Sequence, residues 1–139
     1  MTLRLVPALH RATHAVAMLL DHAPHLGVTQ AEAHVLSHLA EGGQATVAEI
    51  HLAFGHKRST LTSILDRLEA RELITREVSP NDRRSFIVAL TRQGRSLAAK
   101  VAAHLEALEA DVRRHVGKAD AETFERVARA IAEIAERKT

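Results

Sequence analysis

The chain of 139 residues contains no cysteine, tryptophan or tyrosine and only three phenylalanines. The lack of cysteine excludes disulfide bonds, thiolate nucleophiles and cysteine-based redox sensing. Proteins that bind single-stranded nucleic acids usually stack bases on aromatic side chains, and this sequence has few from which to build such a platform. No apolar run approaches the roughly 20 residues that a bilayer requires, and no signal-peptide core is present. We therefore expect a cytoplasmic protein with no membrane segment.

Motifs of common enzymes are also missing. We find no nucleophile–base motif, no phosphate-cradling glycine loop and no His-Glu-x-x-His sequence. We therefore predict that the protein is not an enzyme and needs no cofactor. The apolar fraction of 46% is ample for a core, and there is no repeat or Pro/Gly-rich linker, which predicts a single domain over residues 1–139.

Positive charge is concentrated in one part of the sequence. The net charge of the whole chain is only +2. Residues 56–100 hold ten Lys and Arg against five Asp and Glu, a net of +5, which leaves −3 for the remainder. This segment is therefore the part of the chain best suited to contact a polyanion.

The N-terminal half has the pattern of three helices. Residues 3–21 carry apolar side chains at mostly helical spacing. Thr29 with Glu32, and Thr46 with Glu49, have the spacing of capping boxes that open the second and third helices. We expect the second helix to bury Val35, Leu36 and Leu39 and to stop at Gly42-Gly43, and the third to stop at Gly55.

The next predicted helix, from about residue 58 to 71, has two contrasting faces. Its apolar side chains fall at i, i+3, i+4 and i+7, namely Leu61, Ile64, Leu65 and Leu68. The opposite side carries short polar residues, with Ser59, Ser63 and Asp66 at its centre and Thr60, Thr62 and Arg67 beside them. Short polar side chains allow a helix backbone to approach base edges closely, although an ordinary solvated face has the same composition.

A hairpin and two more helices complete the pattern. Residues 74–78 and 86–90 are β-branched and aromatic runs, joined by a turn with the sequence Ser79-Pro80-Asn81-Asp82-Arg83-Arg84. Thr91 is a plausible N-cap for a long helix that reaches about Val116, Gly117 breaks it, and Asp120 is predicted to cap the last helix. The stripe of that last helix is Phe124, Val127, Ile131 and Ile134.

This order predicts a mainly α fold with a small β-hairpin, a winged helix-turn-helix that lays one helix in a DNA major groove. The DNA-binding part would span about residues 29–94. The first helix and the last two helices, about residues 1–25 and 95–139, carry more apolar side chains than the DNA-binding part can cover. We therefore expect them to be dimerisation helices.

The sequence resembles the MarR (multiple antibiotic resistance regulator) family of bacterial winged-helix proteins. The resemblance rests on Leu61–Glu69, Ile74–Glu77, Asp82-Arg83-Arg84 and Val88–Arg95. It implies a homodimeric transcriptional regulator that binds double-stranded DNA at a pseudo-palindromic operator. Such a regulator is usually a repressor that a small ligand releases.

The resemblance also implies roles for individual residues. Arg84 would enter the minor groove, Asp82 would orient it by a charge-assisted hydrogen bond, and Arg83 would lie nearer phosphate. The remaining predicted DNA contacts, divided between base edges and phosphate, are Lys57, Arg58, Ser59, Thr60, Thr62 and Ser63.

The sequence departs from the family pattern at three positions. Lys57 stands where the family often has a Ser or Thr that caps the recognition helix. Losing that cap would cost about 1 kcal/mol of stability. We therefore interpret Lys57 as a phosphate contact. Ser63 stands where Arg is frequent, so base readout is expected to differ. Glu72 replaces a frequent glycine, which argues against the usual left-handed C-cap.

Ten histidines is a high count. His10 with His14, and His34 with His38, are each four residues apart, and the family resemblance implies that His14, His34, His38 and His104 could converge on an effector pocket. Three interpretations stay open: structural histidines, the lining of a pocket for an organic anion, and a zinc-responsive site. For zinc, the only carboxylates at a suitable spacing are Glu32 and Asp21, and we predict no metal.

A winged-helix module that binds protein rather than DNA is the other alternative. It would require an exposed apolar patch on the recognition face, and Ser59, Ser63 and Asp66 argue against one.

Overall fold

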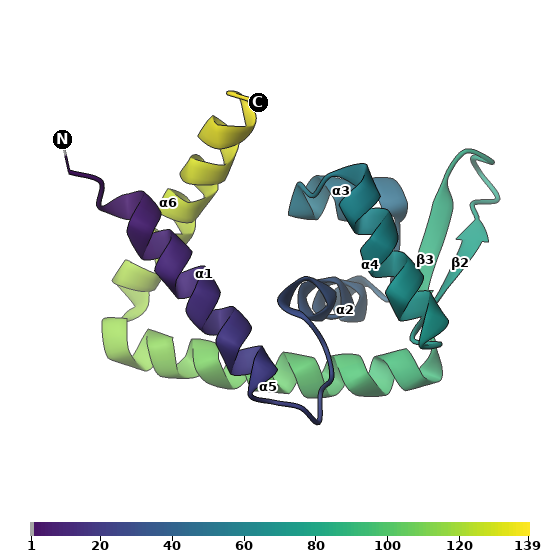
Figure 1. Ribbon diagram of the computed structural model, residues 1–139, viewed down its shortest axis with the longest axis horizontal. Coiled ribbons are helices and arrows are strands. Elements are labelled where there is room, and N and C mark those ends of the chain that lie inside the picture. The colour runs from purple at the N-terminus through teal and green to yellow at the C-terminus, as the bar shows by residue number, and fades with distance from the viewer. Residues whose placement is uncertain (1) are drawn as a thin grey trace. The chain divides into compact units, whose positions relative to one another are not determined.

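The computed structural model describes residues 2–139 and contains six helices and one small sheet (Figure 1). In chain order the elements are α1 (Leu5–Asp21), α2 (Gln30–Gly42), β1 (Gln44–Thr46), α3 (Val47–Phe54), α4 (Arg58–Ala70), β2 (Ile74–Val78), β3 (Phe86–Leu90), α5 (Arg92–Val116) and α6 (Lys118–Glu136). The mainly α winged helix-turn-helix prediction is confirmed. Within this part of the chain, no helix is long and apolar enough to cross a membrane.

The chain forms two compact units, whose boundaries fall inside α1 and α5. One unit is Ala15–Ala102, and the other combines the segment that ends at His14 with Ala103–Thr139. The first, called here the winged unit, contains α2, α3, α4 and the whole sheet. The second, called the helical unit, contains most of α1, the C-terminal part of α5 and all of α6.

The sheet has three strands rather than the two of the predicted hairpin. β2 and β3 have the predicted bounds and pair antiparallel from Ile74 opposite Leu90 to Val78 opposite Phe86. The sequence analysis missed β1, which pairs with the other edge of β3 and gives the order β1-β3-β2. Three residues are too few to show an alternating pattern, and only the pairing with a distant strand makes this segment β.

The core of the winged unit is made of the predicted apolar stripes. Val35, Leu36 and Leu39 of α2 are buried, and so are all four stripe residues of α4. Val88 of the central strand β3 is completely buried. Burying such side chains contributes about 1.5–3 kcal/mol each, so these stripes fix how α2 and α4 face the sheet.

Most helix ends carry the predicted caps. The Thr46–Glu49 capping box is present in both directions, and Thr91 Oγ1 accepts a hydrogen bond from the Gly94 amide at 2.9 Å. Gly55 ends α3 in the left-handed conformation, as expected. The prediction for Asp120 was wrong, because α6 begins at Lys118 with Gly117 as its N-cap and Asp120 lies in the first turn. A carboxylate there still favours the positive end of the helix dipole.

Large apolar side chains of the helical unit are exposed in the single chain. Phe124 is 58% exposed, and the same side of α6 leaves Val127 and Ile134 uncovered. Leu5 and Val6 of α1 and Val112 and Val116 of α5 are also exposed. Arg113 ties α5 to α6 through Glu125 at 3.0 Å. Three of the four residues predicted for the apolar stripe of the last helix are therefore exposed, and Ile131 is half-buried.

Gly94 provides a direct test of the packing in the winged unit. A Cβ atom at this position would overlap the backbone carbonyl of Leu73, whose oxygen accepts a hydrogen bond from the Thr91 amide at 3.0 Å. We expect Gly94→Ala to lower the free energy of unfolding by about 2–3 kcal/mol, because backbone cannot move aside as a side chain can. Urea unfolding measures this change.

Gly42→Ala is the matched control, because nothing lies within 4 Å of a Cβ atom there. It should leave stability unchanged or raise it by about 0.5–1 kcal/mol. Equal stabilities of the two variants would contradict the close approach of α5 to the start of β2.

Candidate nucleic-acid interface

The outer side of α4 is the first part of this candidate interface. Because the four apolar side chains point into the core, the hydroxyl side chains predicted to contact DNA lie on the exposed side of the helix: Ser59, Thr60, Thr62 and Ser63. The Ser63 hydroxyl donates to the Ser59 carbonyl oxygen at 3.0 Å. In this rotamer its oxygen offers only acceptor lone pairs to a neighbouring molecule.

The N-terminal end of α4 is open and basic. Lys57 occupies the N-cap position and makes no side-chain capping hydrogen bond, as the sequence predicted. Lys57 and Arg58 are both exposed. An uncapped first turn presents backbone N–H groups and the positive end of the helix dipole, which favour a negatively charged partner.

The C-terminal end of α4, in contrast, is tightly closed. Glu72 has φ of 59°, and its amide donates to Glu69 while the Leu73 amide donates to Leu68. This is the Schellman pattern, so the expectation that Glu72 would remove the left-handed cap was wrong. The conformation costs a non-glycine residue about 1–2 kcal/mol. A hydrogen bond of 2.7 Å from Thr91 Oγ1 to the Glu72 carbonyl oxygen helps to hold it.

An ion-pair cluster that sequence reasoning missed joins the hairpin to α4. Arg76 of β2 donates to Asp66 at 2.6 Å and to both Glu69 oxygens at 3.0 and 3.1 Å. These hydrogen bonds lower the pKa of the Glu69 carboxyl and raise that of Arg76. Asp66 is therefore held by the hairpin, and the i, i+3 spacing of the two acids was the only signal for it.

Figure 1 shows the consequence of these contacts, with α4 and the β2–β3 hairpin side by side and the hairpin tip projecting beyond the strands. The tip is ordered by its own backbone, since the Ser79 amide donates to Ser85 at 2.9 Å. Arg83 and Arg84 are exposed at this tip.

Asp82 contacts Arg84 through the backbone. Its Oδ1 accepts a hydrogen bond of 2.9 Å from the backbone amide of Arg84. Asp82 therefore shapes the turn that carries Arg84, while the side chain of that arginine stays available. In an Asx turn of this kind, the Asp side chain accepts a hydrogen bond from the backbone amide two residues further along the chain.

The structure places the candidate effector histidines in two groups. His34 and His38 lie on α2 in the winged unit, whereas His14 and His104 belong to the helical unit. His38 meets Phe54 edge to face at 5.5 Å, and Phe54 stacks with His56 at 6.3 Å. Convergence of the four histidines on an effector pocket stays a prediction.

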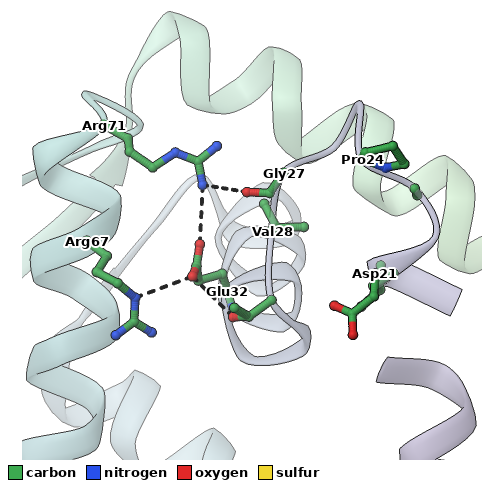
Figure 2. A pocket seen from close by; sticks show the side chains of 10 residues that line it. Asp21, Pro24, Gly27, Val28, Glu32, Arg67 and Arg71 are labelled. Carbon is green, nitrogen blue, oxygen red and sulfur yellow. Dashed lines mark hydrogen bonds and ion pairs between the residues drawn. The ribbon is translucent and has the colours of Figure 1, made fainter. Parts of the chain in front are cut away.

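The cleft that the structure describes is not lined by these histidines. Over residues 2–139, no three His, Asp or Glu side chains come together in a way that could hold a metal ion. A cleft of about 400 Å³ lies between the α1–α2 connection and α4 (Figure 2). Its charged lining is Asp21, Glu32, Arg67 and Arg71. The sequence analysis had named Asp21 and Glu32 only as possible zinc ligands, and it had not assigned Arg71 to any site.

The exposed hydroxyl face of α4, its uncapped basic end and the adjoining basic hairpin together define a winged helix-turn-helix protein. The family model described as MarR family matches residues 26–85. The transcriptional repressor MdtR of Bacillus subtilis is 34% identical over 90 residues, which are 65% of this chain and 58% of that protein. The chain is therefore similar to the MarR family over residues 26–85.

Solved structures of similar proteins have the same fold. BpsR of Bordetella bronchiseptica, whose structure is titled for regulation of its DNA binding by 6-hydroxynicotinic acid, is 25% identical with a TM-score of 0.77, and 93% of each chain is covered. A MarR variant from E. coli complexed with operator DNA is 22% identical with a TM-score of 0.76, covering 91% of this chain and 92% of that one.

The pH dependence of stability tests the surroundings of His34. Burial lowers the pKa of His34 from its usual 6.5, and repulsion from His56 lowers it further. As pH falls below that usual value, the unfolded chain gains a proton on His34 that the folded chain resists. The free energy of unfolding should therefore decrease with acidification until the lower native pKa is passed.

Urea unfolding between about pH 7.5 and about pH 5.5 measures this decrease. His34→Gln should remove its share of the pH dependence, whereas His10→Gln, on the exposed part of α1, serves as the control. Identical pH profiles for the wild type and His34→Gln would show that the His34 pKa does not change on folding.

Proposed function

We propose that this protein is a homodimeric, sequence-specific regulator of transcription that binds double-stranded DNA. The observation that carries the proposal is the orientation of α4. Its apolar stripe is buried, so a row of small hydroxyl side chains faces outward beside a basic hairpin tip. A helix with this composition can lie in a major groove while the hairpin reaches the neighbouring minor groove.

Charge supports duplex DNA as the partner. The segment of residues 56–100, with a net charge of +5, contains both the uncapped end of α4 and the hairpin tip. Lys57, Arg58 and Arg83 would contact phosphates, and Arg84 would enter the minor groove. Each phosphate contact should contribute about −0.9 to the slope of log affinity against log salt concentration.

Base readout would come from the hydroxyl row of α4. With its proton on the Ser59 carbonyl oxygen, Ser63 is suited to accept from an amino group, as cytosine N4 and adenine N6 offer in the major groove. Ser59, Thr60 and Thr62 can donate or accept and would divide between base edges and phosphate.

The exposed apolar side chains of the helical unit support a homodimer. Phe124, Val127 and Ile134 on α6, with Leu5 on α1 and Val112 on α5, would be costly to leave in water. A second copy of the chain would cover them. The symmetric dimer would then read a pseudo-palindrome with half-sites about 34–36 Å apart.

Repression with release by a small ligand is the mode of regulation that the relatives support. MdtR is named a transcriptional repressor, and BpsR is regulated by a small organic acid. The alternative of a protein-binding module receives no support from α4, because its exposed row is polar and basic.

Selection of bound sequences from random duplex DNA tests the proposal directly. We expect enrichment of an inverted repeat, and affinity for it that falls steeply with salt. Failure to enrich any duplex, or an affinity independent of salt, would contradict a DNA-binding role.

The two wing arginines should differ in effect. Arg84→Ala should weaken binding to the selected operator more than binding to random duplex, because minor-groove insertion depends on groove shape. Arg83→Ala should weaken binding to both about equally and reduce the salt slope by about 0.9 per subunit. Gel-shift titrations over a salt series measure both effects.

Sedimentation of both variants should still show dimers, since the hairpin tip lies outside the helical unit. If Arg84→Ala binds the operator as tightly as wild type, the hairpin tip plays no part in recognition.

A further inference from the structure

Glu32 is a buried carboxylate next to the candidate DNA-binding helix. It lies in the first turn of α2 and is only 4% exposed. Its amide donates to Thr29 Oγ1 at 3.2 Å, which is the first half of the predicted capping box. The side chain does not complete the box, because its Oε1 accepts from the Thr29 hydroxyl and the carboxylate turns toward α4.

Two arginines of α4 supply the counter-charge (Figure 2). Arg67 Nε lies 3.4 Å from Glu32 Oε1, and Arg71 Nη1 lies 3.3 Å from Oε2. Arg71 Nη1 also donates to the Gly27 carbonyl oxygen at 2.8 Å. The cluster therefore links the C-terminal half of α4 to both α2 and the α1–α2 connection.

The burial of the three side chains is unequal. The Glu32 side chain is 6% exposed, whereas those of Arg67 and Arg71 are 52% and 42% exposed. A carboxylate so deeply buried needs compensating charge. The arginines, in contrast, could reach water or another anion if Glu32 did not hold them.

The position of Arg67 on α4 makes that alternative relevant to DNA. Arg67 follows Ser59 and Ser63 at steps of four residues, so its Cα continues the exposed hydroxyl row. Its guanidinium nevertheless lines the cleft beside Glu32 (Figure 2). A long cation at the end of such a row would otherwise be available to any phosphate backbone, whatever its sequence.

We propose that Glu32 is a positioning residue for DNA recognition, which holds Arg67 and Arg71 in the cleft and away from phosphates. It thereby limits sequence-independent binding and fixes the C-terminal half of α4 against α2. This role rests on the proposed function and adds a determinant of specificity outside the DNA-contacting surface.

Glu32→Gln tests the role, with Glu41→Gln as the matched control. Both changes remove one negative charge from α2, but Glu41 is exposed. We expect Glu32→Gln to raise affinity for random duplex roughly fivefold to tenfold near 0.1 M salt and to steepen the salt slope by about 0.9 for each arginine released. The ratio of operator to random-duplex affinity should fall. Glu41→Gln should change neither the ratio nor the slope.

Two further variants identify the arginine and keep the test independent of folding. Glu32→Gln combined with Arg67→Gln should return the random-duplex affinity and the slope toward wild type. Arg67→Gln alone should leave the salt slope unchanged, because Arg67 contacts no phosphate while Glu32 holds it. Circular dichroism checks that each variant folds. If Glu32→Gln does not fold, the salt slope of Arg67→Gln still tests whether Arg67 contacts phosphate in the wild type.

Three results would overturn the inference. The first is that Glu32→Gln and Glu41→Gln have the same ratio of operator to random-duplex affinity and the same salt slope. The second is a salt slope for Glu32→Gln that is shallower than that of the wild type. The third is a salt slope for Arg67→Gln that is shallower than that of the wild type. A shallower slope would mean that Glu32 directs Arg67 toward phosphate. If the wild type enriches no duplex at all, the proposed function itself fails, and that outcome is distinct from these three.

Discussion

Burial of the apolar stripe on α4 is the constraint on which the candidate interface depends. Leu61, Ile64, Leu65 and Leu68 are all at least 98% buried, and turning the helix to expose them would cost several kcal/mol. The opposite side of the helix must therefore face outward. The short side chains on that outward side of α4 then determine which bases the helix could recognise.

The two ends of α4 are held very differently. Its C-terminal half is fastened by the Schellman cap, by Arg76 from the hairpin and by Glu32 from α2. Its N-terminal end has no side-chain cap. We infer that the fastened half sets the direction of the helix, while the open end with Lys57 and Arg58 is left to adapt to a ligand.

Local signals allowed much of this arrangement to be predicted from the sequence. The α4 stripe, the bounds of β2 and β3 and the Thr46 capping box depend on residues close together in the chain. The missed features depend on distant partners: β1 needs β3, and Glu32 meets Arg67 and Arg71 across 35 and 39 positions. The Asp120 error had a local cause, because a glycine with positive φ began the helix three residues earlier than the acid suggested.

The central claim is that the hydroxyl row of α4 contacts base edges while the hairpin tip contacts the same duplex. A crystal structure of the protein with its selected operator tests it most directly. The account predicts Ser59 and Ser63 in the major groove, Arg84 in the adjacent minor groove and Arg67 still beside Glu32. A complex in which the exposed side of α4 faces away from the DNA would contradict it.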